Sequence, residues 1–172
     1  FLRNFRDDAI LKTKTGSSFM VAFNTWYYSF SPYVAQFITE HPSVRNMVKF
    51  TLYPLIGILR LGAAAFHLFP SNIEVGAVVS GLVVSSLIGV VYFTAPLTAV
   101  LGYSSKARRI AKMLQLPVVG ILFIALVTAA LVEGVGAQSI LMMLATSTIV
   151  LASLIASALY ASRAILHLAR LA

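Results

Sequence analysis

The sequence predicts an all-α integral membrane protein, and two features of its composition lead to that fold class. Of its 172 residues, 59% are hydrophobic and only 10% are charged, whereas soluble domains carry about 25% charged residues. Its mean hydropathy is +0.91. A soluble domain of this size leaves a large share of its surface in water and cannot hide so much apolar surface. A bilayer removes that constraint, so we expect a multi-pass protein of the cell membrane.

Three apolar stretches predict transmembrane helices, over 75–105, 113–132 and 138–162. The first contains no charged residue, and at about 1.5 Å per residue it is long enough to cross a hydrocarbon core of about 30 Å. Pro96 is expected to kink or end it, because proline removes a helical hydrogen bond. The residues between the stretches predict a basic loop over 106–112 and a turn over 133–136.

A fourth span is predicted over 47–69, where Lys49, Pro54 and Arg60 interrupt the apolar pattern. We expect this helix to follow Ser43 as its N-cap. Arg60 is a candidate buried charge, because an ionisable residue inside a membrane span marks a functional site by default. The alternative is that the segment lies at the interface and that Arg60 extends its guanidinium to the headgroups.

Residues 1–46 predict an amphipathic, interfacial helical region, distinct from a transmembrane helical bundle over 47–172. A charged start is followed over 15–39 by an uncharged stretch rich in aromatic residues. Trp and Tyr favour the headgroup level of a bilayer, where a ring has both apolar and wet contacts. Pro32 predicts a break that divides this stretch into two helices. The aromatic residues at helical spacing are Phe19, Phe23, Tyr27 and Phe30.

The net charge of +8 favours contact with anionic lipid over nucleic acid, because no nucleic-acid-binding motif accompanies it. Basic residues also favour the cytoplasmic side of a membrane. If 47–69 spans, the N-terminal basic residues share that side with Arg163 and Arg170, and Glu74 and Glu133 fall on the other side. If it lies flat, the N-terminal region moves outside. The residues assigned to lipid headgroups are Lys106, Arg108, Arg109 and Lys112.

Small residues at a four-residue spacing predict a close-packing face on the helix that begins near residue 75. Helix association in lipid depends on close backbone approach, because pairing two apolar helices gives little hydrophobic gain. The partner is either the last span or a helix of another chain. The alternative is that Gly and Ser are simply common in membrane helices. The packing residues are Ala77, Gly81, Ser85 and Gly89, with Ser153, Ser157 and Ala161 as the matching set in the last span.

Residue types that carry catalysis or bind metals are scarce. The chain has no cysteine, which excludes disulfides, thiolate catalysis and Cys-based metal sites. None of its three histidines has the i, i+4 spacing of a helical metal site, and Glu40 with His41 needs further ligands from elsewhere. Asp7 and Asp8 are adjacent, so on a helix their side chains converge poorly. We predict no catalytic, cofactor-binding or metal-binding residue, no cofactor, and a protein that is not an enzyme.

Four segments of the first 61 residues form a further pattern. They are 1–7, Tyr27-Tyr28 with Ser31-Pro32, the run 41–49, and Leu52-Tyr53-Pro54-Leu55. Together they resemble the downstream part of the CFI-box C-terminal domain, a family of bacterial and archaeal proteins. The defining upstream box with its cysteine is absent, so no cysteine chemistry is implied. The resemblance implies membrane association at a protein's C-terminal end and an anchor or assembly role.

These observations lead to one principal hypothesis on function. The chain is a non-catalytic polytopic membrane subunit or anchor that packs against other membrane helices in a larger complex. Its partners are then the lipid bilayer and other membrane subunits or a second copy of itself. An accessory subunit of a membrane-bound oxidoreductase, such as a copper membrane monooxygenase, is the alternative. A small transporter or channel is a third hypothesis, which the absence of charge from three of the spans disfavours.

Overall fold

The computed structural model describes residues 2–135 and 140–169, and every regular element in them is a helix. The all-α class is therefore confirmed. Four helical stretches within these residues are long and apolar enough to cross a membrane: α3, α4 to α5, α6 and α7. The elements are α1 (Leu2–Asp8), the 3₁₀ helix η1 (Ile10–Lys12), α2 (Lys14–Glu40), α3 (Pro42–Phe66), α4 (Ile73–Ile88), the π-helix η2 (Gly89–Phe93), α5 (Thr94–Tyr103), α6 (Ser105–Val135) and α7 (Ile140–Leu168).

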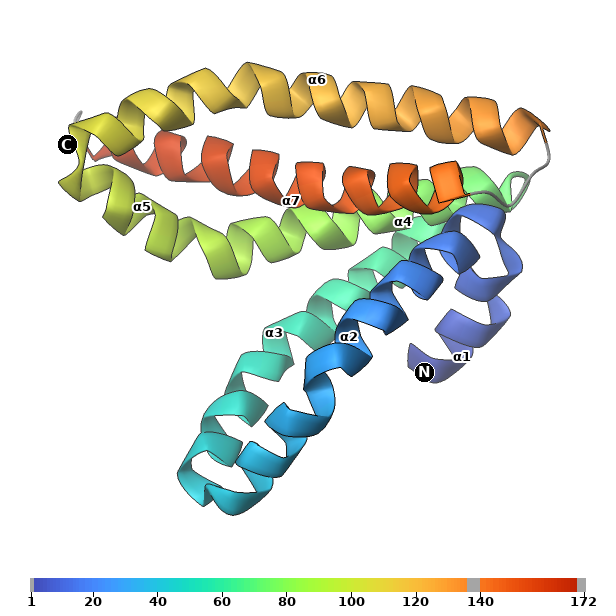
Figure 1. Ribbon diagram of the computed structural model, residues 1–172, viewed down its shortest axis with the longest axis horizontal. Coiled ribbons are helices and arrows are strands. Elements are labelled where there is room, and N and C mark those ends of the chain that lie inside the picture. The colour runs from blue at the N-terminus through green and yellow to red at the C-terminus, as the bar shows by residue number, and fades with distance from the viewer. Residues whose placement is uncertain (1, 136–139, 170–172) are drawn as a thin grey trace.

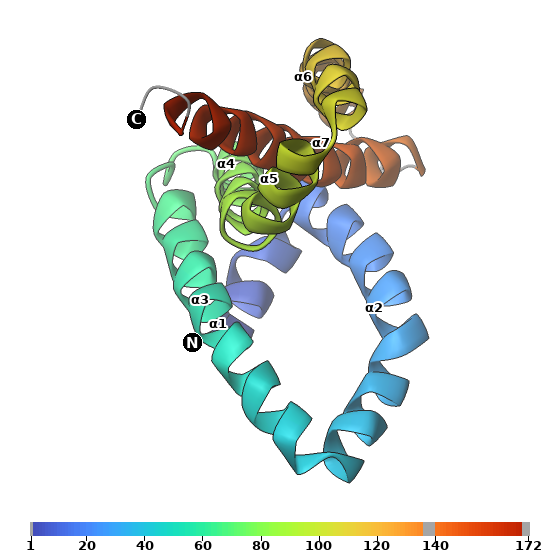
Figure 2. The ribbon, with the colours of Figure 1, turned by 90° about the vertical axis from the view of Figure 1, so that its left-hand side faces the viewer.

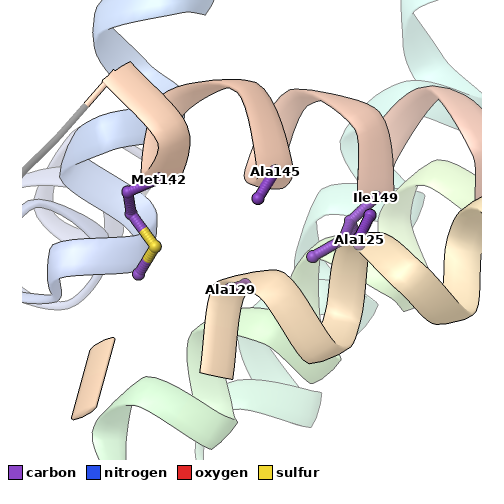
Figure 3. Packing of buried hydrophobic residues seen from close by; sticks show 5 residues of the cluster. All are labelled: Ala125, Ala129, Met142, Ala145 and Ile149. Atoms are coloured by element: carbon purple, nitrogen blue, oxygen red, sulfur yellow. The ribbon is translucent and has the colours of Figure 1, made fainter. Parts of the chain in front are cut away.

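The helices form a bundle around α7, from which a hairpin of α2 and α3 extends (Figure 1). Helix α7 contacts α2, α4, α5 and α6. It packs closely on α6 through alanines, with Ala125 and Ala129 lying against Met142, Ala145 and Ile149 (Figure 3). Small side chains let two helix backbones approach, which is how membrane helices gain dispersion energy. In Figure 2, α2 and α3 diverge from the turn that joins them, and their far ends reach the bundle.

Helix α2 corrects the expected break at Pro32. It is one helix of 27 residues that includes this proline, whereas we expected two shorter helices. Aromatic contacts support the turn before the proline, with Trp26 and Phe30 at 4.8 Å between ring centroids. In an apolar environment, opening the helix would expose several backbone groups, which costs more than the one hydrogen bond that proline removes. Pro54 is accommodated inside α3 in the same way.

Other helix boundaries also differ from those expected. Helix α3 has His41 as its N-cap and Pro42 in its first turn, so Ser43 is not the cap. Proline suits a first turn because its missing N–H has no helical partner there. The π-turn η2 precedes α5, in which Pro96 occupies the third position. Pro96 therefore lies just after the π-turn, and the helical stretch continues past it to Tyr103 without ending there.

Helix α6 is longer than expected at both ends, and it includes residues that we predicted to be a loop and a turn. Its 31 residues include the predicted basic loop over 106–112 and the first three residues of the predicted turn over 133–136, whose last residue lies outside the described residues. The helix starts early because Ser104 accepts a hydrogen bond from the backbone N–H of Ala107 at 3.2 Å. Lys, Arg and Ala are also strong helix formers, so nothing in 105–112 opposes the helix.

Candidate functional site

The paired acids near the N-terminus each lie beside a basic residue. Arg6 donates from Nε to Asp7 Oδ1 at 2.7 Å, and Lys12 Nζ lies 3.8 Å from Asp8 Oδ1. The hydrogen bond from Arg6 lowers the pKa of Asp7 below its ordinary value, so this carboxyl is a poor proton donor near neutral pH. Across residues 2–135 and 140–169, no group of three His, Asp or Glu residues is placed to hold a metal ion.

The main polar site of the bundle is a ladder of contacts between α7 and the continuous stretch from α4 to α5. Ser85 and Ser153 are both buried and share a hydrogen bond between their Oγ atoms at 2.5 Å. Ser162, which is fully buried, donates to the carbonyl of Thr94 at 3.2 Å. In each pair the two residues are 68 positions apart in the sequence. The two helical stretches therefore run parallel and in constant register.

Gly89 lies against α7 between these two hydrogen-bonded pairs. A Cβ built on Gly89 would collide with the Ser157 Oγ and with the backbone carbonyl of Leu154. Only a glycine therefore lets α7 approach this closely. The same point is the start of the π-turn η2, where i→i+5 hydrogen bonds replace the i→i+4 bonds of the α-helix. Thr94 Oγ1 lies 3.5 Å from the Gly89 carbonyl and helps to satisfy it, as buried backbone groups require.

The predicted small-residue face is divided among several neighbours. Ser85 and Gly89 contact α7, as their match with Ser153 and Ser157 suggested. Ala77 instead packs against Phe66, and a Cβ built on Gly81 would meet no atom within 4 Å. Steps of four residues drift by about 40° around a helix. Over three steps the drift reaches about 120°, so one straight partner cannot cover all four positions. Ala161 is half-buried on α7.

Sequence reasoning missed the role of Glu74. Its carboxylate accepts hydrogen bonds from the backbone N–H groups of Lys14 at 2.6 Å and Thr15 at 3.1 Å. Thr13 completes this cap by accepting from the N–H of Gly16 at 3.0 Å. A negative charge at a helix N-terminus is favourable because the first N–H groups have no partner inside the helix. An acid at the start of one helix cannot be assigned from sequence to the N-terminus of another.

The contact between Glu74 and the start of α2 contradicts the distribution of charge that we expected if α3 spans the membrane. We expected the N-terminal basic residues on the side opposite Glu74, but Lys14 contacts Glu74 directly. The reason is the unbroken α2, which carries the chain away from this end before α3 returns it (Figure 1). Lys14 therefore lies beside Glu74, and in the segment that precedes it Arg6 is paired with Asp7 and Lys12 with Asp8.

At the opposite end, the residues assigned to lipid headgroups lie in the first turns of α6. Lys106, Arg109 and Lys112 are exposed and Arg108 is half-buried. Arg163 on α7 donates from its Nη1 to the buried Gln115 of α6. Gln115 was not predicted, since a lone polar residue in an apolar stretch gives little signal. Arg170 lies outside the described residues.

Arg60 is exposed on α3 and forms no hydrogen bond or ion pair with the described residues of its own chain. Glu74, the nearest acid that follows it in sequence, is occupied by α2. The predicted polar contact of Arg60 is therefore not supplied from within these residues.

The fold and these contacts define a class: an all-helical protein with four stretches fit to cross a membrane, held together by small and hydroxyl-bearing residues. No model of a protein family, no curated protein and no solved structure matches the chain. The resemblance of its first 61 residues to the CFI-box C-terminal domain stays a prediction.

Proposed function

We propose that this chain is a non-catalytic, multi-pass membrane subunit or anchor that packs against helices of other membrane proteins. The observation that carries this proposal is the outward face of α3, which comprises Phe50, Tyr53, Gly57, Arg60 and Ala64. All five residues are exposed. They recur at intervals of three and four, so they form one seam along the helix, of the kind that a second helix occupies.

Arg60 indicates the chemistry of the partner. A guanidinium placed in hydrocarbon costs at least about 2.5 kcal/mol even on the mildest scale, and no described residue of this chain neutralises it. Gly57 and Ala64 lie one helical turn before and after Arg60. A Cβ built on Gly57 would meet no atom within 4 Å. The backbone of a partner helix therefore has room to approach. The partner that fits this seam is a membrane helix that carries a carboxylate.

Two further features agree with an assembly role. The hydroxyl groups of the Ser85–Ser153 and Ser162–Thr94 contacts are used to join helices, which leaves no nucleophile beside a base there. The resemblance to the CFI-box C-terminal domain implies an anchor or assembly role for residues 1–61.

Gentle detergent extraction followed by mass spectrometry of the bound proteins tests the proposal. We expect at least one membrane protein with an acidic residue in an apolar helix to remain bound. A metal-bearing partner among the bound proteins would specify an accessory role in an oxidoreductase. Recovery of this chain without any partner, under all mild conditions, would contradict the proposal.

The substitution Arg60→Gln is expected to reduce the recovered partner by at least about tenfold. Removing one member of a buried charge pair leaves the other member unpaired, at a cost of about 2 kcal/mol or more. The matched control is Lys49→Gln, which removes one charge from the same helix nearer its start. The guanidinium of Arg60 lies six residues before the end of α3 and can also extend toward headgroups. Unchanged partner recovery with Arg60→Gln would show that lipid, not protein, neutralises it.

The start of α6 is expected to face the cytoplasm, with the α3–α4 connection on the opposite side. Residues 105–115 contain four basic residues and no acid, whereas acids accompany the basic residues around the start of α2. The positive-inside rule then sets the orientation. Because the chain has no cysteine, single introduced cysteines report cleanly. In intact cells, Ser71→Cys should react with an impermeant thiol reagent and Ser105→Cys should not. The reverse pattern would invert the orientation. Gln138, a natural choice for the outer site, lies outside the described residues.

A further inference from the structure

The end of α5, the start of α6 and the end of α7 lie together (Figure 1), and basic residues are concentrated in these segments. Residues 94–115 and 156–169 contain no Asp or Glu. The basic side chains of this end are Lys106, Arg108, Arg109, Lys112 and Arg163. No salt bridge within the described residues involves any of them. Their charge is therefore not compensated by the described part of this chain.

The helix geometry makes this arrangement costly without an anion. Positive charges lie in the first turns of α6, where no acid is present. The N-terminus of a helix carries a partial positive charge, so acids are favoured there and bases are not. An anion bound at this end would offset both the side-chain charges and the helix dipole.

At the seam between α6 and α7 two polar side chains meet, and a third, the exposed Lys112, lies one turn away along α6. Lys112 and Gln115 lie one turn apart on α6, and Arg163 of α7 contacts Gln115. Ala111 packs beside them against Leu159 of α7, which brings the two helices close together here. Arg108 lies one turn before Lys112 and is half-buried, as expected of a residue at the edge of this seam.

The donors at this seam match a phosphate group. A guanidinium has five N–H donors and an ammonium has three, and the contact with Gln115 uses one of those on Arg163. Phosphate oxygens accept several charged hydrogen bonds at once, with arginine as the preferred partner. The aromatic Tyr103, at the end of α5, is 95% exposed, and exposed tyrosines of membrane helices favour the headgroup level.

We propose that Arg108, Lys112 and Arg163, with Gln115 orienting Arg163, bind the phosphate of an anionic lipid headgroup. Basic sites between membrane helices at the cytoplasmic surface are suited to such headgroups. This site requires only that the chain lies in a bilayer. It goes beyond the proposed role in a complex and is tested without any partner protein.

The test compares full-length protein reconstituted in phosphatidylcholine vesicles with and without 20% phosphatidylglycerol, about one lipid in five. Native mass spectrometry of protein extracted from the mixed vesicles counts bound lipids. We expect retained phosphatidylglycerol and a higher melting temperature in the mixed vesicles. Lys112→Gln should weaken retention about fivefold, the effect of one basic residue near an anionic surface. Lys112 makes no described side-chain contact, so its loss leaves the fold intact. Adding Arg163→Gln should abolish retention.

The control removes equal charge elsewhere, with Arg45→Gln and Lys49→Gln in α3. This pair should retain phosphatidylglycerol as the wild type does. Equal loss in both double variants would show a general effect of net charge and would overturn the site. Inorganic phosphate added to detergent-solubilised protein separates the two sources of phosphate. A rise in melting temperature equal to that given by the lipid would identify a soluble phosphate ligand instead and would contradict the lipid assignment.

Discussion

Replacing Gly89 with alanine is expected to lower the free energy of unfolding by about 1–3 kcal/mol, the usual cost of overpacking a close contact. The new methyl group would meet the Leu154 carbonyl of α7. A backbone oxygen cannot move aside as a flexible side chain does, so α4 and α7 must separate. That separation would also weaken the neighbouring hydrogen bond between Ser85 and Ser153. Thermal unfolding in a mild detergent, followed by circular dichroism, measures the effect.

The matched control is Gly81→Ala on the same face of α4. A Cβ at Gly81 meets no atom within 4 Å, and alanine favours a helix by about 0.5–1 kcal/mol over glycine. We therefore expect this variant to be as stable as the wild type or slightly more stable. Equal destabilisation by the two substitutions would contradict the ladder between α4 and α7. Normal stability of Gly81→Leu with reduced recovery of a complex would instead place a partner helix at Gly81.

The helical class and the approximate spans were predictable from sequence because long apolar runs are a strong signal. The polar residues between the runs were a weaker guide. Ser104 and the strong helix formers after it extend α6 over residues that read as a loop. Pro32 and Pro54 read as interruptions, although both helices continue through them. The extension of α6 follows local helix propensity, whereas at the two prolines local propensity yields to the need to keep backbone groups paired.

The contacts between helices were only partly predictable. The match of Ser85 with Ser153 follows from small residues in register and is found in the structure. The Glu74 cap depends on where α2 begins in space, which no local pattern records. The Arg163–Gln115 contact similarly joins two helices whose relative rotation is set by alanine packing. Sequence indicates which faces are close-packed, whereas side-chain pairing depends on helix rotation and tilt.

Replacing Glu74 with glutamine is expected to release the N-terminal segment from the bundle. The carboxylate accepts two backbone hydrogen bonds at the start of α2. An amide has one oxygen to offer, and its NH₂ group would face a backbone N–H, so one donor is left unpaired. Losing a helix cap costs about 0.5–2 kcal/mol, and a partly buried charge beside a helix N-terminus adds up to about 2 kcal/mol.

The effect should be local, because the segment over residues 2–12 packs on α3 through Phe5 and Ala9, which lie near Phe66. Limited proteolysis of the purified protein should then cut Glu74→Gln between α1 and α2 at least about tenfold faster than wild type, while the bundle core remains intact. Glu133→Gln, which removes an acid from the same end on α6, serves as the control and should be cut at the wild-type rate. Equal rates for all three proteins would show that the segment is held by apolar contacts, with the carboxylate contributing little.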